Sequence, residues 1–408
     1  MVHISELVTS KKVSNKTVNN TFNDTIKQSN DEKKNDQTKD LSVSGYHKVD
    51  DIGFIEEEVN NDFDPMNEQY FIAYNNYKSD FANENIKPEP ILSELSSQDT
   101  IFPIKYNTVW KNYKTQEKLH WIAEEIDMSK DYDHWIQKLD DDDRKFIMHV
   151  LAFFSASDGI VNANIKKNLI DLIKIKEAEC AYGKQFAMEN IHGEMYSIML
   201  DLFIGHDGVL KEKLINAVKT MPSIKKKAQW CKRWIDCDKT FAHKLVAFAI
   251  VEGVFFSGSF ASIFWLKTRP GSIMPGLIKS NKFIARDENL HVELACILYG
   301  LLVNKLKEKV VYEIIEEAIL IEEEFINSSL PCKLLGMNSE LMSQYIKYTA
   351  DRLLVQLGYT KKYNVTNPFE YMKKIDTFVK VNFFEERNDA YSNSKIDNPR
   401  IFNLLEKF

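Results

Sequence analysis

The chain has 408 residues, 44% of them hydrophobic, so it is long enough to bury one large core or two smaller ones. It contains only 14 Gly and 10 Pro, and long stretches lack both, which favours helices over sheets. The formal net charge of −7 argues against a general nucleic-acid-binding protein, which normally carries a surplus of Lys and Arg.

Residues 1–89 are expected to form a largely disordered or loosely ordered extension. Residues 1–45 are polar, and such a segment cannot bury enough apolar surface to offset the entropy lost on ordering. Residues 46–90 add aromatic side chains to an acidic stretch, and their structure stays open. No secretory signal is expected, and five Cys without a CxxC pair favour reduced thiols, so we expect a cytoplasmic protein.

Residues 90–385 are predicted to form an all-α domain. Its helices are expected to break at Asp141-Asp142-Asp143, at Met221-Pro222 and at Arg269-Pro270-Gly271. Residues 245–266 form an apolar run long enough to span a membrane, and no comparable run is expected elsewhere. Glu252 lies near its middle, so we interpret the run as a central helix of a bundle and expect no membrane association.

Two Glu-x-x-His motifs lie in apolar helical surroundings, and each follows an acid within a hydrophobic run. The first set is Asp158, Glu189 and His192, and the second is Glu252, Glu288 and His291. A carboxylate and an imidazole at i and i+3 share one helix face. Two such pairs with two single carboxylates match the pattern of di-iron and di-manganese four-helix bundles. The sequence therefore predicts a ferritin-like four-helix bundle core with additional surrounding helices.

Each of these residues alone has a simpler explanation. A buried acid often contacts only an Arg or a backbone amide, and chance often produces a single Glu-x-x-His. A third copy, Glu117 and His120, lies in a polar stretch, and we interpret it as a solvated helix face. Together, however, four carboxylates and two imidazoles form an oxygen-rich donor set that suits iron or manganese better than structural zinc.

Tyr196 lies four positions after His192, so it shares the helix face of the ligands. An isolated tyrosine would be interpreted as a core residue with a satisfied hydroxyl group. Beside a di-metal centre, its phenol could instead be oxidised.

Several segments of the chain resemble the eukaryotic-type small subunit of class I ribonucleotide reductase. They are SDGIVNAN, FAMENIHGEMYS, VEGVFFSGSFASIFWLK, ARDENLH, GMNSELMSQYIKYTADRLL, NPFEYM and NFFEER. The resemblance implies two irons per chain, one on each ligand set, with manganese left open. It also implies that Tyr196 becomes a radical in a reaction with oxygen. Phe255 and Phe256 are expected to line the pocket of this tyrosine.

The resemblance further implies a catalytic large subunit as partner, which reduces ribonucleotides to deoxyribonucleotides with the radical it receives. The matching radical-transfer positions are His192, Asp287, Trp121 and Tyr391. Residues 386–408 are expected to be a flexible tail, in which the segment from Phe402 to Phe408 docks on the large subunit. A homodimer is expected, without nucleic-acid partners.

The chain departs from the family pattern at four positions, Ala163, Gly193, Lys279 and Lys407. None of them is a candidate ligand or Tyr196. They leave room for altered radical stability or a changed partner.

Three other functions remain as alternatives. Another di-iron oxidase, such as a desaturase or hydroxylase, would need neither Tyr196 nor the tail, and ferritin-like storage fits neither the tail nor the chain length. An accessory small subunit that makes no radical would be marked by loss of a ligand or of the tyrosine, and all seven residues are present.

Overall fold

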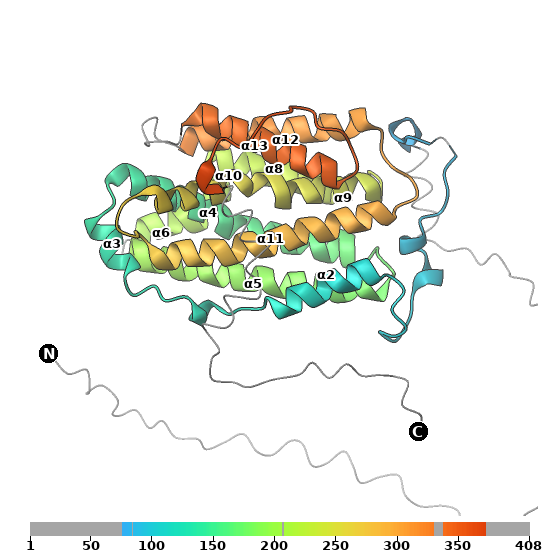
Figure 1. Ribbon diagram of the computed structural model, residues 1–408, viewed down its shortest axis with the longest axis horizontal. Coiled ribbons are helices and arrows are strands. Elements are labelled where there is room, and N and C mark those ends of the chain that lie inside the picture. Colours follow the sequence, from blue (N-terminus) through green and yellow to red (C-terminus); the bar gives the residue numbers. More distant parts are fainter. Residues whose placement is uncertain (1–75, 84, 206–207, 330–337, 373–408) are drawn as a thin grey trace, which may run out of the picture. The chain divides into compact units, whose positions relative to one another are not determined.

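The computed structural model describes residues 76–83, 85–205, 208–329 and 338–372 (Figure 1). Tyr391, the tail and residues 1–75 lie outside the described residues, so the expectations for them stay predictions. The all-α prediction is confirmed, because the described residues form helices and, besides these, a single isolated bridge between Phe81 and Leu306. Four cysteines within these ranges are free thiols.

The helices follow one another along the chain with short connections. The α-helices are α2 (Asn107–Lys118), α3 (Asp131–Gln137), α4 (Asp141–Asn164), α5 (Lys176–Ile204), α6 (Gly208–Ile215), α7 (Ala217–Thr220), α8 (Pro222–Asp236), α9 (Phe241–Ile250), α10 (Ser257–Phe264), α11 (Pro275–Leu301), α12 (Glu308–Ser329) and α13 (Ser339–Gln356). Two π-helices are η5 (Ile165–Ile170) and η6 (Val251–Phe255). Short 3-10 helices are η1 (Lys78–Asp80), η2 (Pro90–Leu92), η3 (Glu94–Ser96), η4 (Ala123–Glu125) and η7 (Trp265–Thr268).

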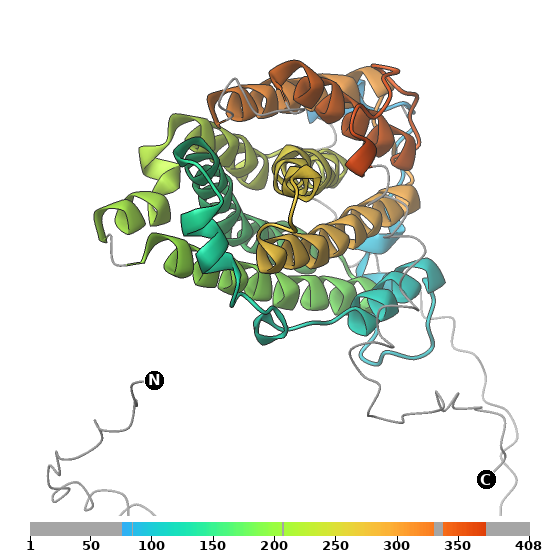
Figure 2. The same cartoon turned by 60° about the vertical axis from the view of Figure 1, so that its left-hand side comes forward.

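The core consists of four helical segments: α4, α5, α11 and the continuous stretch α9–η6–α10. Helix α4 packs on α5, α5 packs on α11, and α11 packs on α9 and η6. Helices α2, α8, α12 and α13 pack around these segments, and Figure 2 shows α9–η6–α10 near the middle of the bundle. The predicted ferritin-like core with surrounding helices is therefore confirmed.

Two helices are long and apolar enough to pass as membrane spans, Asp141–Ile170 and Phe241–Thr268. The second contains the run singled out from the sequence, and 89% of its most apolar window is buried inside the bundle. The expectation that no other comparable run exists was wrong, since the Asp141–Ile170 helix is also long and apolar enough to span a membrane. The most apolar part of this helix is 56% buried, and the helix also belongs to the core.

The acidic run at the start of α4 begins the helix rather than breaking it. The Asp140 carboxylate accepts a hydrogen bond from the Asp143 amide (2.8 Å), and the Asp143 carboxylate accepts one from the Asp140 amide (3.3 Å). This reciprocal cap satisfies two amides that the first turn leaves without helical partners. The other two expected breaks are confirmed, because they fall between α7 and α8 and between η7 and α11.

The start of α11 is fixed by a buried carboxylate. Asp131 accepts hydrogen bonds from the amides of Gly276 (2.9 Å) and Leu277 (2.7 Å). A Cβ atom at position 276 would lie 2.5 Å from Met128 Sδ and 2.7 Å from the Asp127 carbonyl oxygen, so only glycine fits here. This contact fixes the position of a helix that carries two of the candidate ligands.

Contacts with the bundle begin upstream of residue 90. The buried Phe81 pairs with Leu306, and the Ala82 amide donates to the Lys305 carbonyl (2.9 Å). The Glu89 carboxylate accepts hydrogen bonds from the amides of Val303 (2.7 Å) and Asn304 (2.8 Å). The helical body therefore includes residues that precede the expected domain boundary.

Candidate metal centre

The six candidate ligands come from all four core segments. Asp158 lies on α4, Glu189 and His192 on α5, Glu252 on η6, and Glu288 and His291 on α11. None of the six is more than 5% exposed. The i, i+3 spacing places each Glu and His on one face of its helix, and the packing of α5 against α11 turns the two faces toward each other.

Glu189 and Glu288 occupy the middle of this cluster, because each of them reaches both imidazoles. Glu189 lies 3.0 Å from His291 Nδ1 through Oε1 and 3.3 Å from His192 Nδ1 through Oε2. Glu288 lies 3.1 Å from His192 Nδ1 and 2.9 Å from His291 Nδ1. Ligand atoms of Glu189, Glu252, Glu288 and His291 all lie within 4.8 Å of one another. Glu189 and Glu288 therefore lie between the two candidate ligand sets.

The outer nitrogen of His192 faces Asp287, whose carboxylate also meets Trp121. His192 Nε2 lies 3.2 Å from Asp287 Oδ2, and the Trp121 Nε1–H donates to the same oxygen (2.7 Å). Burial alone would lower the pKa of His192, but its hydrogen bonds to Asp287, Glu189 and Glu288 raise it well above its usual value. The structure thus joins three of the four predicted transfer residues in one hydrogen-bonded series.

The Glu252 side of the cluster has a different neighbour. Gln185, which is fully buried on α5, donates from Nε2 to Glu252 Oε1 (3.0 Å) and lies 3.4 Å from Glu189 Oε1. In contrast to His192, the outer Nε2 of His291 has no hydrogen-bond partner among the described residues.

The pKa values of the cluster reflect burial and crowding of like charges. Burial and then the charge of Glu189 raise the pKa of Asp158, while burial and then the charge of Glu288 raise that of Glu252. Burial would lower the pKa of His291, but Glu288 and Glu189 raise it to about 9. Burial would raise the pKa of Glu288, but the two histidines lower it well below its usual value. Without a cation, protons compensate part of the negative charge.

The donor set fits a pair of metal ions. Asp158 Oδ2 and Glu252 Oε2 are buried and have no hydrogen-bond partner among the described residues. Buried polar atoms are normally satisfied, so these atoms call for cations. Four carboxylates and two imidazoles suit iron or manganese, and four negative charges balance two divalent ions.

Tyr196 lies on α5 with the ligands and is only 2% exposed. Its ring stacks on Phe154 with centroids 4.9 Å apart and planes 7° apart, and Phe154 in turn packs on Phe260 (4.9 Å). Of the two expected pocket residues, Phe256 lies behind Phe154 (5.9 Å), whereas Phe255 packs on Trp230 (5.0 Å). Burial, and then the charge of Asp158, raise the pKa of Tyr196 well above its usual value.

A cleft between α10, α11 and α13 reaches two of the candidate ligands. Its lining includes Glu252, Glu288 and Thr349 as well as the half-buried Arg352 and the exposed Gln356. The cluster is therefore connected to the protein surface on its Glu252 side.

The third Glu-x-x-His does not form a ligand pair. Helix α2 ends at Lys118, between Glu117 and His120, so the two side chains do not share a helix face. Glu117 pairs with Lys114 and Tyr113, while His120 Nδ1 lies 2.8 Å from Lys184 Nζ. The two residues lie toward solvent as expected, but they do not form the expected helix face, because His120 lies beyond the end of α2.

Three of the four departures from the family pattern lie on described helices. A Cβ atom at Gly193 would lie 3.8 Å from Asp158 Oδ2, so this position leaves space beside a candidate ligand. Lys279 donates to the Glu125 carbonyl (2.9 Å), and its ammonium lies 5.5 Å from the centroid of the Phe283 ring. Ala163 is exposed, and Lys407 lies outside the described residues.

Two site residues were missed from the sequence, Gln185 and Phe154. Each lies one helical turn before a candidate ligand, Gln185 before Glu189 and Phe154 before Asp158. The i−4 spacing could have flagged both of them, because residues four apart share a helix face.

Comparisons with known proteins agree on one family. A family model described as "Ribonucleotide reductase, small chain" matches residues 98–368. The ribonucleoside-diphosphate reductase small chain of Acanthamoeba polyphaga mimivirus is 67% identical over 367 residues, which cover 90% of this chain and 88% of the viral protein. Subunit M2 of Mesocricetus auratus ribonucleoside-diphosphate reductase is 51% identical over 76% of this chain and 80% of its own. The solved Rnr4 homodimer from Saccharomyces cerevisiae, a ribonucleotide reductase, is 36% identical with a TM-score of 0.65, covering 77% of this chain and 97% of that one.

Proposed function

Because the chain belongs to the family of ribonucleotide reductase small chains, an oxidoreductase family, we propose that it generates the radical used by a ribonucleoside-diphosphate reductase. The observation that supports this most is that all six candidate ligands and Tyr196 are buried, and that four of these candidates have ligand atoms within 4.8 Å of one another. An accessory subunit that makes no radical would not need to retain all seven residues.

Asp158, Glu189 and His192 would hold one iron, and Glu252, Glu288 and His291 would hold the other. Glu189 and Glu288 each lie within reach of both imidazoles. Reduced iron bound there would supply the oxidising chemistry with oxygen, and the Tyr196 phenol would be the group that loses one electron and one proton. The protein holds the donor atoms in place before metal arrives, because each ligand lies on a helix of the packed core.

The surroundings of Tyr196 preserve the radical. The phenol is protonated at neutral pH, and its raised pKa further disfavours the phenolate, so oxidation must remove the proton as well as the electron. Phe154 covers one face of the ring, and the aromatic cluster behind it excludes water and reductants from that side.

The radical leaves toward the large subunit through His192, Asp287 and Trp121. Their hydrogen bonds of 3.2 and 2.7 Å form a continuous series from a ligand to a buried indole. Tyr391 and the tail from Phe402 to Phe408 would complete the connection. Apolar anchors on such a tail are a physically reasonable way to dock on a partner.

We further propose that the chain works as a cytoplasmic homodimer without nucleic-acid or membrane partners. The homodimer of the yeast relative supports the assembly, and the burial of the Phe241–Thr268 helix, 89% over its most apolar part, supports the absence of a membrane.

Reconstitution tests this function. The iron-loaded chain, combined with a ribonucleotide reductase large subunit, should reduce ribonucleoside diphosphates. Removing residues 402–408 should abolish this activity and leave the metal content unchanged. Activity that survives the truncation would contradict the tail assignment. Absence of activity in the full chain, with two irons bound, would favour the accessory-subunit alternative.

A further inference from the structure

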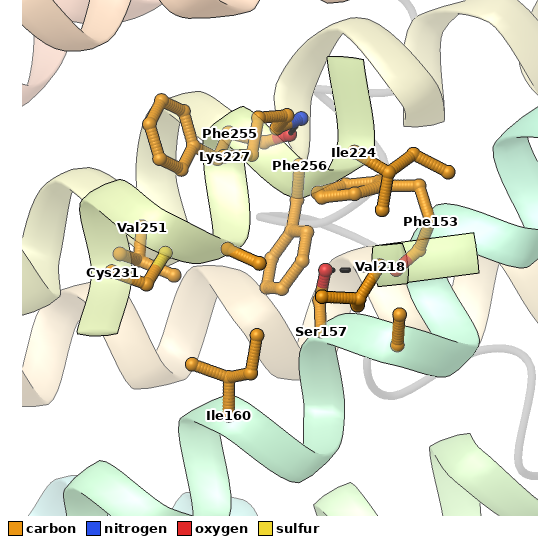
Figure 3. A pocket seen from close by; sticks show the side chains of 12 residues that line it. Phe153, Ser157, Ile160, Val218, Ile224, Lys227, Cys231, Val251, Phe255 and Phe256 are labelled. Carbon is orange, nitrogen blue, oxygen red and sulfur yellow. Dashed lines mark hydrogen bonds between the residues drawn. The ribbon is translucent and has the colours of Figure 1, made fainter. Parts of the chain in front are cut away.

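Lys227 is a charged side chain buried in the interior of the bundle. It lies on α8, is 1% exposed, and lines an apolar cavity with Phe153, Phe255 and Phe256 (Figure 3). Its ammonium lies 3.4 Å from the centroid of the Phe153 ring. A charge in such surroundings is unfavourable unless it is fully paired.

The pairing comes from two different helices. Lys227 Nζ donates to the Phe255 carbonyl oxygen at 2.7 Å and lies 2.6 Å from Glu322 Oε2 on α12. Glu322 is itself fully buried. A Cβ atom at Gly258 would lie 2.7 Å from Glu322 Oε1, so this carboxylate also packs closely on the start of α10.

The contact of Lys227 with Phe255 and the contact of Glu322 with Gly258 both act on the helical stretch that carries Glu252. Phe255 is the last residue of the π-helix η6, three positions after Glu252, and Gly258 follows in α10. π-Helical segments are rare departures from regular α-helix, and they occur frequently at functional sites. The geometry points to Lys227 and Glu322 as a positioning pair that holds η6 so that the Glu252 carboxylate faces the metal centre. This inference rests on the proposed role of Glu252 as a ligand.

A second line of contacts leads from Lys227 to Tyr196. The ammonium packs on Phe153, the Phe153 ring packs on Phe256 (5.7 Å), and Phe256 packs on Phe154, which stacks on Tyr196. A displaced Lys227 would therefore disturb the wall of the tyrosine pocket together with η6.

The buried Lys227–Glu322 ion pair is expected to contribute little to the stability of the fold. Burial lowers the pKa of Lys227 to about 8 and raises that of Glu322 to about 7, because each charge has lost its water. Replacing both members of a buried pair by apolar residues of similar size is often neutral or stabilising. A role in positioning can therefore be separated from a role in stability.

The test uses the full chain with Lys227→Met combined with Glu322→Leu, so that no unpaired charge remains buried. Mn²⁺ binding is titrated by electron paramagnetic resonance, and the Tm of the metal-free protein is measured. We expect a Tm equal to or above that of the unaltered chain, with affinity for one of the two Mn²⁺ ions, the one in the Glu252 half, reduced by about 10- to 100-fold, the range typical of groups that orient ligands. Unchanged affinity in the folded double variant would overturn the proposal.

Asp143→Asn serves as the matched control. Asp143 is equally buried, and Arg269 Nη2 donates to it at 2.7 Å. The other partners of this pair are Asp140, Leu266 and Trp265, which lie outside η6. This variant should lower the Tm and leave Mn²⁺ affinity unchanged. A matching loss of affinity would mean that any buried pair acts this way, which also overturns the proposal. Glu252→Ala separates the two hypotheses: if it still binds two Mn²⁺ ions, the ligand assignment itself is wrong.

Discussion

The two halves of the candidate centre differ in how their outer ligands are held. Asp158 and His192 lie on regular α-helices, and the outer nitrogen of His192 faces Asp287, which is bonded to Trp121. Glu252 lies on a π-helix, and the outer nitrogen of His291 has no hydrogen-bond partner among the described residues.

The two halves therefore have different surroundings and are expected to have different roles. The Asp158 half is connected through His192 and Asp287 to the buried indole of Trp121. The Glu252 half borders the cleft toward the surface. Lys227, which is paired with Glu322, contacts the end of its π-helix at the Phe255 carbonyl. Glu189 and Glu288 lie between the halves and belong to both.

The largest effect should come from removing a shared carboxylate. Glu288→Ala should abolish binding of both ions, because Glu288 faces both imidazoles, whereas Glu252→Ala should leave one ion bound in the Asp158 half. Counting Mn²⁺ ions per chain checks both variants. One ion retained by Glu288→Ala would show that this residue does not serve both halves.

The hydrogen-bonded series from His192 through Asp287 to Trp121 should matter for radical transfer rather than for assembly of the metal centre. Asp287→Asn removes a charge from the series between His192 and Trp121, so turnover with the large subunit should fall by about 10- to 100-fold. Iron content and radical yield should stay near those of the unaltered chain. A loss of the radical itself would indicate that Asp287 acts on the metal site instead.

Metal should stabilise the protein more strongly as the pH rises. His291 has a pKa of about 9, above its usual value, so its contribution to the metal-free fold is complete below about pH 6.5 and is lost as the pH rises through about 9. The raised pKa values of Asp158 and Glu252 act in the same direction, because ionisation of these groups opposes folding without metal. The difference in Tm with and without Mn²⁺ should therefore grow between pH 6.5 and 9. A constant difference would contradict proton displacement by the metal.

The smallest effects compare two glycines, one beside each half. Gly258→Ala should destabilise the fold by about 1–3 kcal/mol, because its Cβ would meet Glu322 and Ile326 within 3 Å. Gly193→Ala should stabilise it by about 0.5–1 kcal/mol, because a helical glycine is replaced and the contact with Asp158 is ordinary. Urea denaturation of the metal-free variants measures both values. Equal effects would mean that the two halves are packed alike.

Sequence spacing was sufficient to predict the helical fold and to select six candidate ligands that are all buried, four of which have ligand atoms within 4.8 Å of one another. The reason is that i, i+3 and i, i+4 positions fix which residues share a helix face. Trp121 and Asp287 came only from the family resemblance, because their contact joins positions far apart in the chain. Lys227 and Glu322 could not be predicted, since Lys227 lies in a run of lysines and Glu322 in a run of glutamates. Only the packing of α8 and α12 distinguishes these two from their solvated neighbours.

The most direct measurement is electron paramagnetic resonance of the chain after anaerobic loading with ferrous iron and exposure to oxygen. The unaltered chain should bind two irons and show a tyrosyl radical signal, and Tyr196→Phe should bind the same iron without that signal. A chain with two irons and no radical, or a tyrosyl signal that survives Tyr196→Phe, would contradict the account.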